Sequence, residues 1–429
     1  MVEETLNHLP QPDVPAITWW MRVNKILTRK RLKYAWILGI ALWLTWLLSL
    51  ILGKGNLDLA GQVIGTDFIQ FYSAGVTVNA RQEDRLYDFA YQSHVEQSVA
   101  GPGLTSFHAF ITPPFFALPF VYLSRLYYPV SFIVWSLIGF TGLWLSIRWL
   151  GYRQPWSPFF WCLTFFPVFA AISFGQNSLI SLTILSLVYR SWRREKTLLA
   201  GLIGSLVLFK PQLALGILIL WLFDWRRSWR AVIGFVLGGS CLSVLSFILM
   251  PNASQVYIKL ALTELSALNT KAGYPLWHLH TINGFWLLLF PGQSWLANIA
   301  LLIFALIGIY YFLRLYRLFQ RDQAILYAFA IGLTLLITPH AMIYDWSLLL
   351  IPALLLWAYQ PAHRPHWQAS FAVIWLVSLI SGVLAYLQLK VMPIAIQISL
   401  PIFLFILIDS YLTLVKGSKP SMLLQELSQ

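Results

Sequence analysis

The feature that most constrains this chain is a series of long apolar runs that recurs along nearly its whole length. The runs have about 15–25 residues, the length that an α-helix needs to cross a lipid bilayer. Trp, Tyr and short clusters of Lys and Arg stand at their ends, as at membrane borders. Hydrophobic residues make up 59% of the chain and charged residues 10%, which is outside the range of soluble domains. We therefore expect an all-α, polytopic bundle of transmembrane helices in contact with the lipid bilayer.

The basic residues are explained by membrane topology rather than by nucleic-acid binding. The formal net charge is +13, and the Lys and Arg residues lie in short clusters between apolar runs, where cytoplasmic loops carry them. We therefore expect no nucleic-acid partner. The two cysteines, Cys162 and Cys241, lie inside apolar runs, so neither a disulfide framework nor a metal site is indicated.

The charge pattern divides the chain into two tails and one membrane domain. Residues 1–33 are predicted to be a cytoplasmic N-terminal tail, because a basic cluster directly precedes the first apolar run. Residues 34–415 form the membrane domain, and 416–429 form a cytoplasmic C-terminal tail. Residues 54–106 hold six acidic and three basic residues, and are predicted to form the first outer loop. Two stretches of this loop, 68–78 and 86–99, have the spacing of short helices at the membrane interface.

Ten full crossings are predicted. They cover about 34–53, 127–149, 156–173, 177–190, 229–250, 294–318, 322–338, 346–359, 367–388 and 391–415.

Two further apolar segments are irregular. The segment 109–123 contains three prolines, so it is a kinked short span or a re-entrant piece. The segment 197–222 is interrupted at Lys210-Pro211 and lies between two basic clusters that both fit the cytoplasmic side, so we expect it to enter the membrane and return. If both segments cross instead, there are twelve spans, and the basic cluster 190–196 lies outside. The expected number of transmembrane spans is therefore about 10–12.

This topology groups the unusual polar residues on the outer side. The group contains Asp67, Gln176, Asn177, Lys210, the segment 269–283 and His340. Polar residues at membrane depth are costly and usually face a cavity. Several of them on one side therefore predict a single cavity, which Tyr72, Asn283 and Asp345 are candidates to line.

Asp67 is the candidate general base. It precedes the aromatic residues Phe68, Phe71 and Tyr72 at a membrane border. Transfer of a sugar to a hydroxyl requires a carboxylate that takes the proton of the acceptor. The alternative is that Asp67 caps the helix that starts near Phe68, since Asp is a favoured N-cap residue.

The other polar residues are suited to a sugar phosphate. Lys210 lies deep in an apolar run, where it requires a partner such as a phosphate; the alternative is a lysine that reaches back to the interface. The amides of Gln176 and Asn177 can hold sugar hydroxyls or phosphate oxygens, or form a polar turn. His340 is suited to donate to a leaving phosphate or to orient Asp67, or is simply interfacial. Asp345 either pairs with His340 or faces water.

Other donor chemistries lack their motifs. His278 and His280 have no third ligand in a zinc-like spacing. The chain contains no DxD, P-loop or GxGxxG motif, which disfavours a metal-bound nucleotide sugar and an ATP-driven mechanism. We expect neither a metal nor a cofactor.

Several motifs in a fixed order resemble glycosyltransferase family 87. They are T-D-F-x-x-F-Y-S-A (66–74), R-L-Y-D (85–88), T-P-P-F-F-A-L (112–118), F-G-Q-N-S (174–178) and A-G-x-x-G-S-L-V-L-F-K-P-Q (200–212). The resemblance covers about 35–410. This family belongs to the GT-C superfamily of multispanning enzymes, which includes the polyprenol-phosphate-mannose-dependent mannosyltransferases of mycobacteria.

The resemblance implies a GT-C fold and a polyprenyl-phosphate-sugar donor. The sugar is most often mannose, transferred with inversion at the outer or periplasmic face. It also implies that Asp67 is the base and that the GQ and KP steps correspond to Gln176 and Lys210. A late histidine of the family is similar to His340. The family often has Asn-Gln-Ser in its later outer loop, whereas this chain has Thr281–Gly284, with Asn283 as the nearest counterpart.

We therefore expect a multi-pass plasma-membrane hexosyltransferase, mannosyltransferase-like, whose acceptor is a glycolipid or another glycan. The alternative is a non-catalytic flippase or transporter of a lipid-linked sugar, which would need the cavity and the cation but no base. A structural subunit of a cell-envelope complex is a third reading. Sensitivity to Asp67→Asn separates the enzyme from the transporter.

Overall fold

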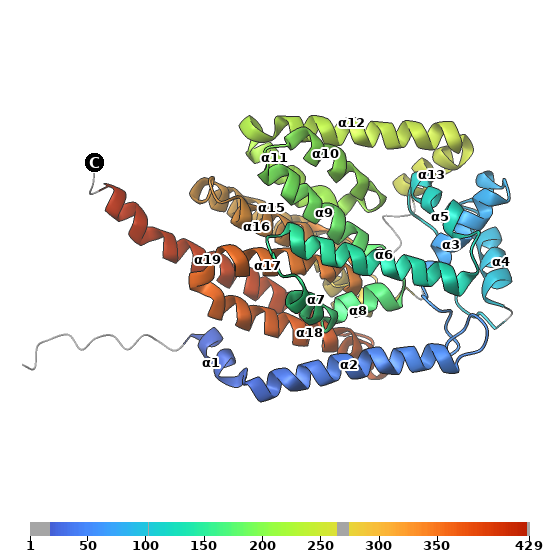
Figure 1. Ribbon diagram of the computed structural model, residues 1–429, viewed down its shortest axis with the longest axis horizontal. Coiled ribbons are helices and arrows are strands. Elements are labelled where there is room, and N and C mark those ends of the chain that lie inside the picture. Colours follow the sequence, from blue (N-terminus) through green and yellow to red (C-terminus); the bar gives the residue numbers. More distant parts are fainter. Residues whose placement is uncertain (1–17, 102, 264–273, 427–429) are drawn as a thin grey trace, which may run out of the picture.

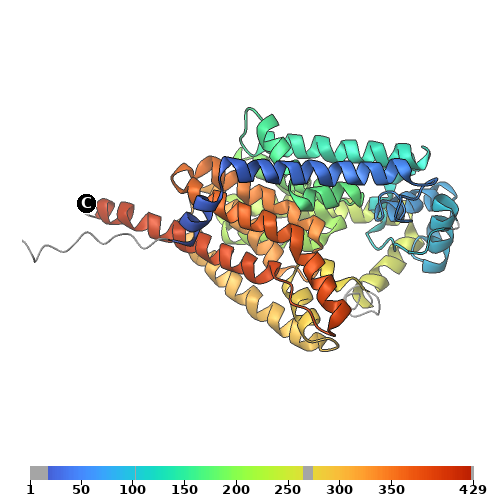
Figure 2. The ribbon, with the colours of Figure 1, turned by 90° about the horizontal axis from the view of Figure 1, so that it is seen from below.

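The computed structural model describes residues 18–101, 103–263 and 274–426, and in this part of the chain the regular structure is helical, with only isolated β-bridges. The long helices run side by side along one axis of the molecule (Figures 1 and 2). α1 (Trp19–Ile26) and the C-terminal end lie at one end of the bundle, and α3 (Phe68–Asn79) and α4 (Phe89–Ala100) lie at the other. The predicted all-α, polytopic architecture is confirmed.

Six helices of the described chain are long and apolar enough to cross a membrane. They are α2 (Arg29–Leu52), α6 (Tyr128–Trp149), α12 (Trp225–Leu249), α15 (Ser294–Leu318), α18 (Arg364–Val391) and α19 (Ser399–Glu426), whose apolar part is Ser399–Lys416. The segment 156–173, where a crossing is expected, consists of two apolar helices, α7 (Trp156–Leu163) and α8 (Phe166–Ser173), which meet at 75° and count as a seventh span if the bent pair is one span. The helix α8 begins after Phe165, with Pro167 in its first turn.

The other expected crossings are shorter helices inside the protein. They are α9 (Ser178–Arg193), α16 (Gln323–Ile337) and the continuous η8–α17 segment (Ile343–Tyr359). α16 is buried along almost its whole length, and a helix that is apolar on all sides is stable where protein surrounds it. α2 is the opposite case, since Gly39 is its one buried residue and much of the helix surface is exposed.

The irregular segment 197–222 forms a helical hairpin, as predicted. α10 (Thr197–Ser205) and η4 (Leu206–Phe209) lead to Lys210, and η5 (Pro211–Ala214) and α11 (Leu215–Phe223) lead back. The two ends of the hairpin lie close together, because Trp192 Nε1 donates a hydrogen bond to Ser228 Oγ over 2.9 Å. The two basic clusters therefore lie at the same end, and Lys210 lies at the turn.

Glycines allow this hairpin to pack closely against its neighbours. A Cβ at Gly201 of α10 would overlap the carbonyl of Ala231 in α12, and a Cβ at Gly234 would overlap the carbonyl of Leu198. Small residues at such positions let two helix backbones approach in a membrane. The hairpin is thereby held against the spanning helix α12 along its length.

The first loop contains both predicted helices, and one of them is largely buried by the rest of the protein. α3 is buried against α5 (Leu118–Leu123), since most of its residues are inaccessible. The prolines of the irregular segment 109–123 start η3 (Pro114–Ala117), which continues into α5. The remaining helices beyond the hairpin are α13 (Pro251–Thr263), η7 (Leu276–His278) and α14 (Ile282–Leu289).

The predicted N-terminal tail is partly folded. Residues 18–33 form α1 and the start of α2, and Trp19 Nε1 donates to Asp409 Oδ2 of α19 over 2.8 Å. Predictions for residues 1–17, 269–273 and 427–429 lie outside the described residues.

Candidate active site

Asp67 stands at the first residue before α3, but its side chain does not cap that helix. No side-chain hydrogen bond to the first turn is present. Instead Gln176 Nε2 donates to Asp67 Oδ2 over 3.0 Å, and His108 Nδ1 lies 3.4 Å from Asp67 Oδ1. The side chain is 21% exposed. The carboxylate is therefore directed to residues far away in sequence and remains accessible, as a general base must be.

The turn after α8 positions the residues that contact Asp67. Gly175 has φ +66°, a left-handed conformation that favours glycine, and a Cβ there would overlap the side chain of Phe68. Trp135 Nε1 donates to the carbonyl of Gly175 over 2.9 Å. The carbonyl of Phe174 accepts from the backbone N–H of Asp67 over 2.8 Å. The turn is thus fixed from both sides, directly beside Asp67.

Lys210 lies at the turn of the hairpin because Pro211 ends the first arm. A proline disfavours helical backbone in the residue before it, and Lys210 has φ −135° and ψ 73°. Its Nζ lies 2.7 Å from Asp345 Oδ1 and 4.9 Å from the centre of the Tyr344 ring. The side chain is 12% exposed. A cation is therefore held in a nearly buried position at the turn of the hairpin.

Asp345 is the partner of Lys210 and is buried, so the alternative that it faces water is wrong. Its side chain is 1% exposed. Ser178 Oγ donates to its Oδ1 over 2.6 Å, and the backbone N–H of Met342 donates to its Oδ2 over 3.2 Å. A buried charge persists when it is paired and hydrogen-bonded, and this carboxylate meets both conditions.

His340 lies on the far side of this ion pair. The OH of Tyr274 lies 3.1 Å from its Nδ1, and Gln212 Nε2 donates to its carbonyl over 3.4 Å. A different histidine, His108, contacts the Asp67 carboxylate, with its Nδ1 at 3.4 Å from Oδ1. His108, rather than His340, is therefore the candidate to orient Asp67.

Sequence reasoning missed His108 and its neighbour Glu96. Glu96 is almost fully buried, and its Oε2 accepts from the backbone N–H of His108 over 3.1 Å. Burial raises the pKa of Glu96 to about 7, and the charge of Asp67 adds to this, against the effect of His108. Burial lowers the pKa of His108, but the hydrogen bond and charge of Asp67, with the charge of Glu96, produce a net increase. The available signal was a helical i, i+4 pair of polar residues, Gln92 and Glu96, in the first loop.

Three other candidates differ in where they lie. Asn177 is fully buried beside Gln176, whose Oε1 accepts from its backbone N–H over 3.1 Å. Tyr72 is not directed to the cluster, since its OH donates to the carbonyl of Leu126 over 2.9 Å. Asn283 donates to Asn298 of α15 over 3.1 Å.

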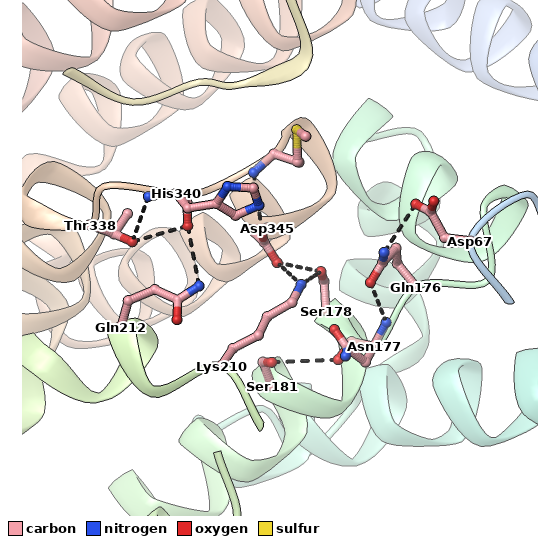
Figure 3. A network of polar contacts seen from close by, with 11 residues as sticks. Asp67, Gln176, Asn177, Ser178, Ser181, Lys210, Gln212, Thr338, His340 and Asp345 are labelled. Atoms are coloured by element: carbon pink, nitrogen blue, oxygen red, sulfur yellow. Dashed lines mark hydrogen bonds and ion pairs between the residues drawn. The ribbon is translucent and has the colours of Figure 1, made fainter. Parts of the chain in front are cut away.

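One short segment joins the two charged centres. Gln176 contacts Asp67, and Ser178, two residues later, contacts both Asp345 and Lys210 (Figure 3). The structure therefore brings together six of the predicted residues: Asp67, Gln176, Asn177, Lys210, His340 and Asp345. Such a site presents an accessible carboxylate and a nearly buried ammonium close to each other, an arrangement suited to transfer of a group from an anionic leaving group.

The comparisons with known proteins agree with this chemistry. The profile of glycosyltransferase family 87 matches residues 110–339, which is more than half of the chain. The match includes Gln176 and Lys210, while Asp67, His108 and Asp345 lie outside it. Comparison with curated proteins and with solved structures gave no match. The chain is a multi-pass membrane protein and belongs to glycosyltransferase family 87.

Proposed function

We propose that this glycosyltransferase moves a hexose, most directly mannose, from a polyprenyl-phosphate donor to an acceptor hydroxyl, with inversion. The observation that carries the proposal is the placement of Asp67 and Lys210 at two ends of one segment, residues 176–178. A base on one side of a sugar and a cation on the other is the arrangement that an in-line displacement requires.

The proposed reaction uses each group once. Asp67 takes the proton of the acceptor hydroxyl while the acceptor oxygen attacks the anomeric carbon. The bond between that carbon and the phosphate oxygen breaks, and the phosphate leaves with the electron pair. Lys210 offsets the charge that develops on the phosphate. Attack opposite to the leaving group inverts the anomeric centre, and the new glycosidic bond replaces the phosphate ester bond.

The depth of Lys210 favours a lipid-linked phosphate. Leu208 lies against Gly239 of α12, ten residues before the helix ends at Leu249. At about 1.5 Å per residue, Lys210 is therefore roughly 15 Å along the span from its nearer end. A single ammonium is a compact charge that suits a phosphate. A donor whose tail stays in the bilayer delivers its phosphate to this depth without leaving the membrane.

The proposed location is the outer side of the plasma membrane. Lys210 lies at the opposite end of the hairpin from the basic cluster 190–196 and Arg226, Arg227 and Arg230. Basic clusters of this kind lie on the cytoplasmic side. The acceptor, a glycolipid or another glycan, would then approach Asp67 from the outside.

The test is sugar transfer by purified protein in proteoliposomes. Radiolabelled polyprenyl-phosphate-mannose, a nucleotide-linked mannose and a polyprenyl mannoside without phosphate are offered with a lipid acceptor extract. We expect transfer from the first donor alone, insensitivity to a metal chelator, and a product of inverted anomeric configuration by NMR. Transfer from the nucleotide donor, or a product of retained configuration, would contradict the proposal. Movement of the donor across the bilayer without transfer would instead indicate a transporter.

A further inference from the structure

We propose that His108 is a positioning residue for Asp67, and that Glu96 fixes the backbone of His108. This inference rests on the proposed role of Asp67 as the base. It concerns what fixes the direction in which the carboxylate points.

Two donors hold the two oxygens of Asp67 separately. His108 Nδ1 lies 3.4 Å from Oδ1, and Gln176 Nε2 lies 3.0 Å from Oδ2. The donors come from different parts of the chain, one before η3 and the other after α8. A carboxylate held at both oxygens has a fixed plane, and each oxygen accepts a further hydrogen bond. The lone pairs that face the acceptor hydroxyl are thereby pre-oriented, which lowers the barrier to proton transfer.

The ring of His108 is fixed in turn. Its Nε2 lies 3.1 Å from Ser106 Oγ, and its backbone N–H donates to Glu96 Oε2 over 3.1 Å. One turn earlier on α4, Gln92 Oε1 accepts from the backbone N–H of Phe110 over 2.8 Å. Gln92 and Glu96 are four residues apart, so both project from one face of the helix. Together they hold the segment 108–110 against α4.

The charges around His108 agree with this arrangement. The titratable groups that face it are Asp67 and Glu96, and the net effect of its surroundings is a raised pKa. The ring therefore carries a proton over a wider pH range than a solvent-exposed histidine. A protonated ring donates from both nitrogens, to Asp67 and to Ser106.

A pair of His108 variants separates the hydrogen bond from the packing of the ring. His108→Asn keeps a nitrogen donor near the position of Nδ1 and removes the ring. His108→Phe keeps the ring and removes both nitrogens. We expect His108→Phe to lower kcat by about 10²-fold with the KM for the lipid donor changed less than about twofold. We expect His108→Asn to retain most of kcat and to lose the pH dependence that the histidine contributes to the rate.

The outcomes distinguish this inference from the proposed function. Equal kcat values for wild type and a folded His108→Phe would overturn the positioning role, as would a His108→Asn variant as slow as His108→Phe. Asp67→Asn runs in the same assay. If Asp67→Asn transfers sugar at the wild-type rate, the proposed base itself is wrong. If Asp67→Asn is inactive while His108→Phe is fully active, only the role of His108 is wrong.

A pair of Glu96 variants tests the second part of the proposal. Glu96→Gln keeps an oxygen acceptor for the His108 N–H, so its kcat should stay within about threefold of wild type, whereas the kcat of Glu96→Ala should approach that of His108→Phe. Equal kcat values for the two Glu96 variants would remove Glu96 from the proposal.

Discussion

Asp67 and Asp345 are two carboxylates that residues 176–178 contact, and they differ in exposure: Asp67 is accessible, whereas Asp345 is buried. Asp67 is 21% exposed, and its contacts in the described chain are an amide and a histidine. Asp345 is 1% exposed and accepts from Lys210, Ser178 and the backbone of Met342. The accessible carboxylate has capacity left for a substrate proton, while the oxygens of the buried one are already engaged. The surroundings, rather than residue type, thus support the proposed base at Asp67 and make Asp345 the counter-ion of Lys210.

The burial of Asp345 also explains how Lys210 is held in position. A lysine without Asp345 would be an unpaired buried charge, which is costly in a membrane. With Asp345, Ser178 and the ring of Tyr344 around it, the ammonium is held in one position. Asp345 is therefore the residue that keeps the Lys210 ammonium in place.

The most disruptive test of the comparison removes one partner of the ion pair. Lys210→Met leaves Asp345 as an uncompensated buried charge, so we expect a loss of about 3–5 kcal/mol in stability. The double variant Lys210→Met/Asp345→Asn should recover most of that stability but not sugar transfer. Thermal unfolding in detergent and the transfer assay measure the two quantities. Recovery of transfer in the double variant would show that the cation has no catalytic role.

The pH dependence of stability tests the surroundings of Asp67, in particular Glu96. Burial raises the pKa of Glu96 from 4.5 to about 7. A raised pKa means that the folded protein binds this proton more tightly than the unfolded chain. Its contribution to stability is therefore complete below about pH 4.5 and is lost as the pH rises through about 7. The size is about 3 kcal/mol, since one pKa unit corresponds to about 1.4 kcal/mol.

The matching measurement is the unfolding temperature between pH 4.5 and 8. Glu96→Gln should flatten its dependence on pH, whereas Glu195→Gln, at an exposed position near the other end of the bundle, should leave it as in wild type. If Glu96→Gln and wild type show the same slope, Glu96 does not titrate in this range.

A smaller effect is expected from a change in the turn at Gly175, which positions the residues that contact Asp67 and Asp345. Gly175→Ala places a Cβ at φ +66° and against Phe68. We expect a loss of about 1–3 kcal/mol in stability and a parallel decrease in transfer, because Gln176 and Ser178 shift together. Gly292, also at positive φ but with open space around it, offers the matched control. Equal effects of alanine at the two glycines would show that strain alone, and not the position of the turn, is measured.

The smallest effect is expected from Tyr72, and it tests whether this residue belongs to the site. Tyr72 was a cavity candidate, but its OH donates to the carbonyl of Leu126. Tyr72→Phe should cost about 1 kcal/mol in stability and change transfer by less than about twofold. A large loss of transfer with unchanged stability would place Tyr72 in the site after all.

The architecture was largely predictable because its signals are local. Apolar length and basic clusters predicted the long spans, and the two basic clusters predicted the hairpin around Lys210. The burial of α3 was not predictable, because it depends on packing against α5, which lies about 50 residues later in the chain.

The site was predictable in its members but less so in their contacts. Asp67, Gln176 and Lys210 were unusual enough to be recognised one by one. The partners of Lys210 and Asp67 come from residues far away in sequence: Asp345 lies 135 positions from Lys210, and Gln176 lies 109 positions from Asp67. His108 stands alone in an apolar stretch, and only the fold of the 54–113 segment brings it beside Asp67.

The most direct measurement compares wild type and Asp67→Asn in a single turnover. Each protein is first loaded with polyprenyl-phosphate-mannose, and acceptor is then added. If Asp67 is the base, we expect donor affinity within about twofold of wild type and a transfer rate lower by about 10²–10⁴-fold, because the proton acceptor is lost while Lys210 and its partners remain. A folded Asp67→Asn variant that binds the donor and transfers sugar at the wild-type rate would contradict the proposed role of Asp67.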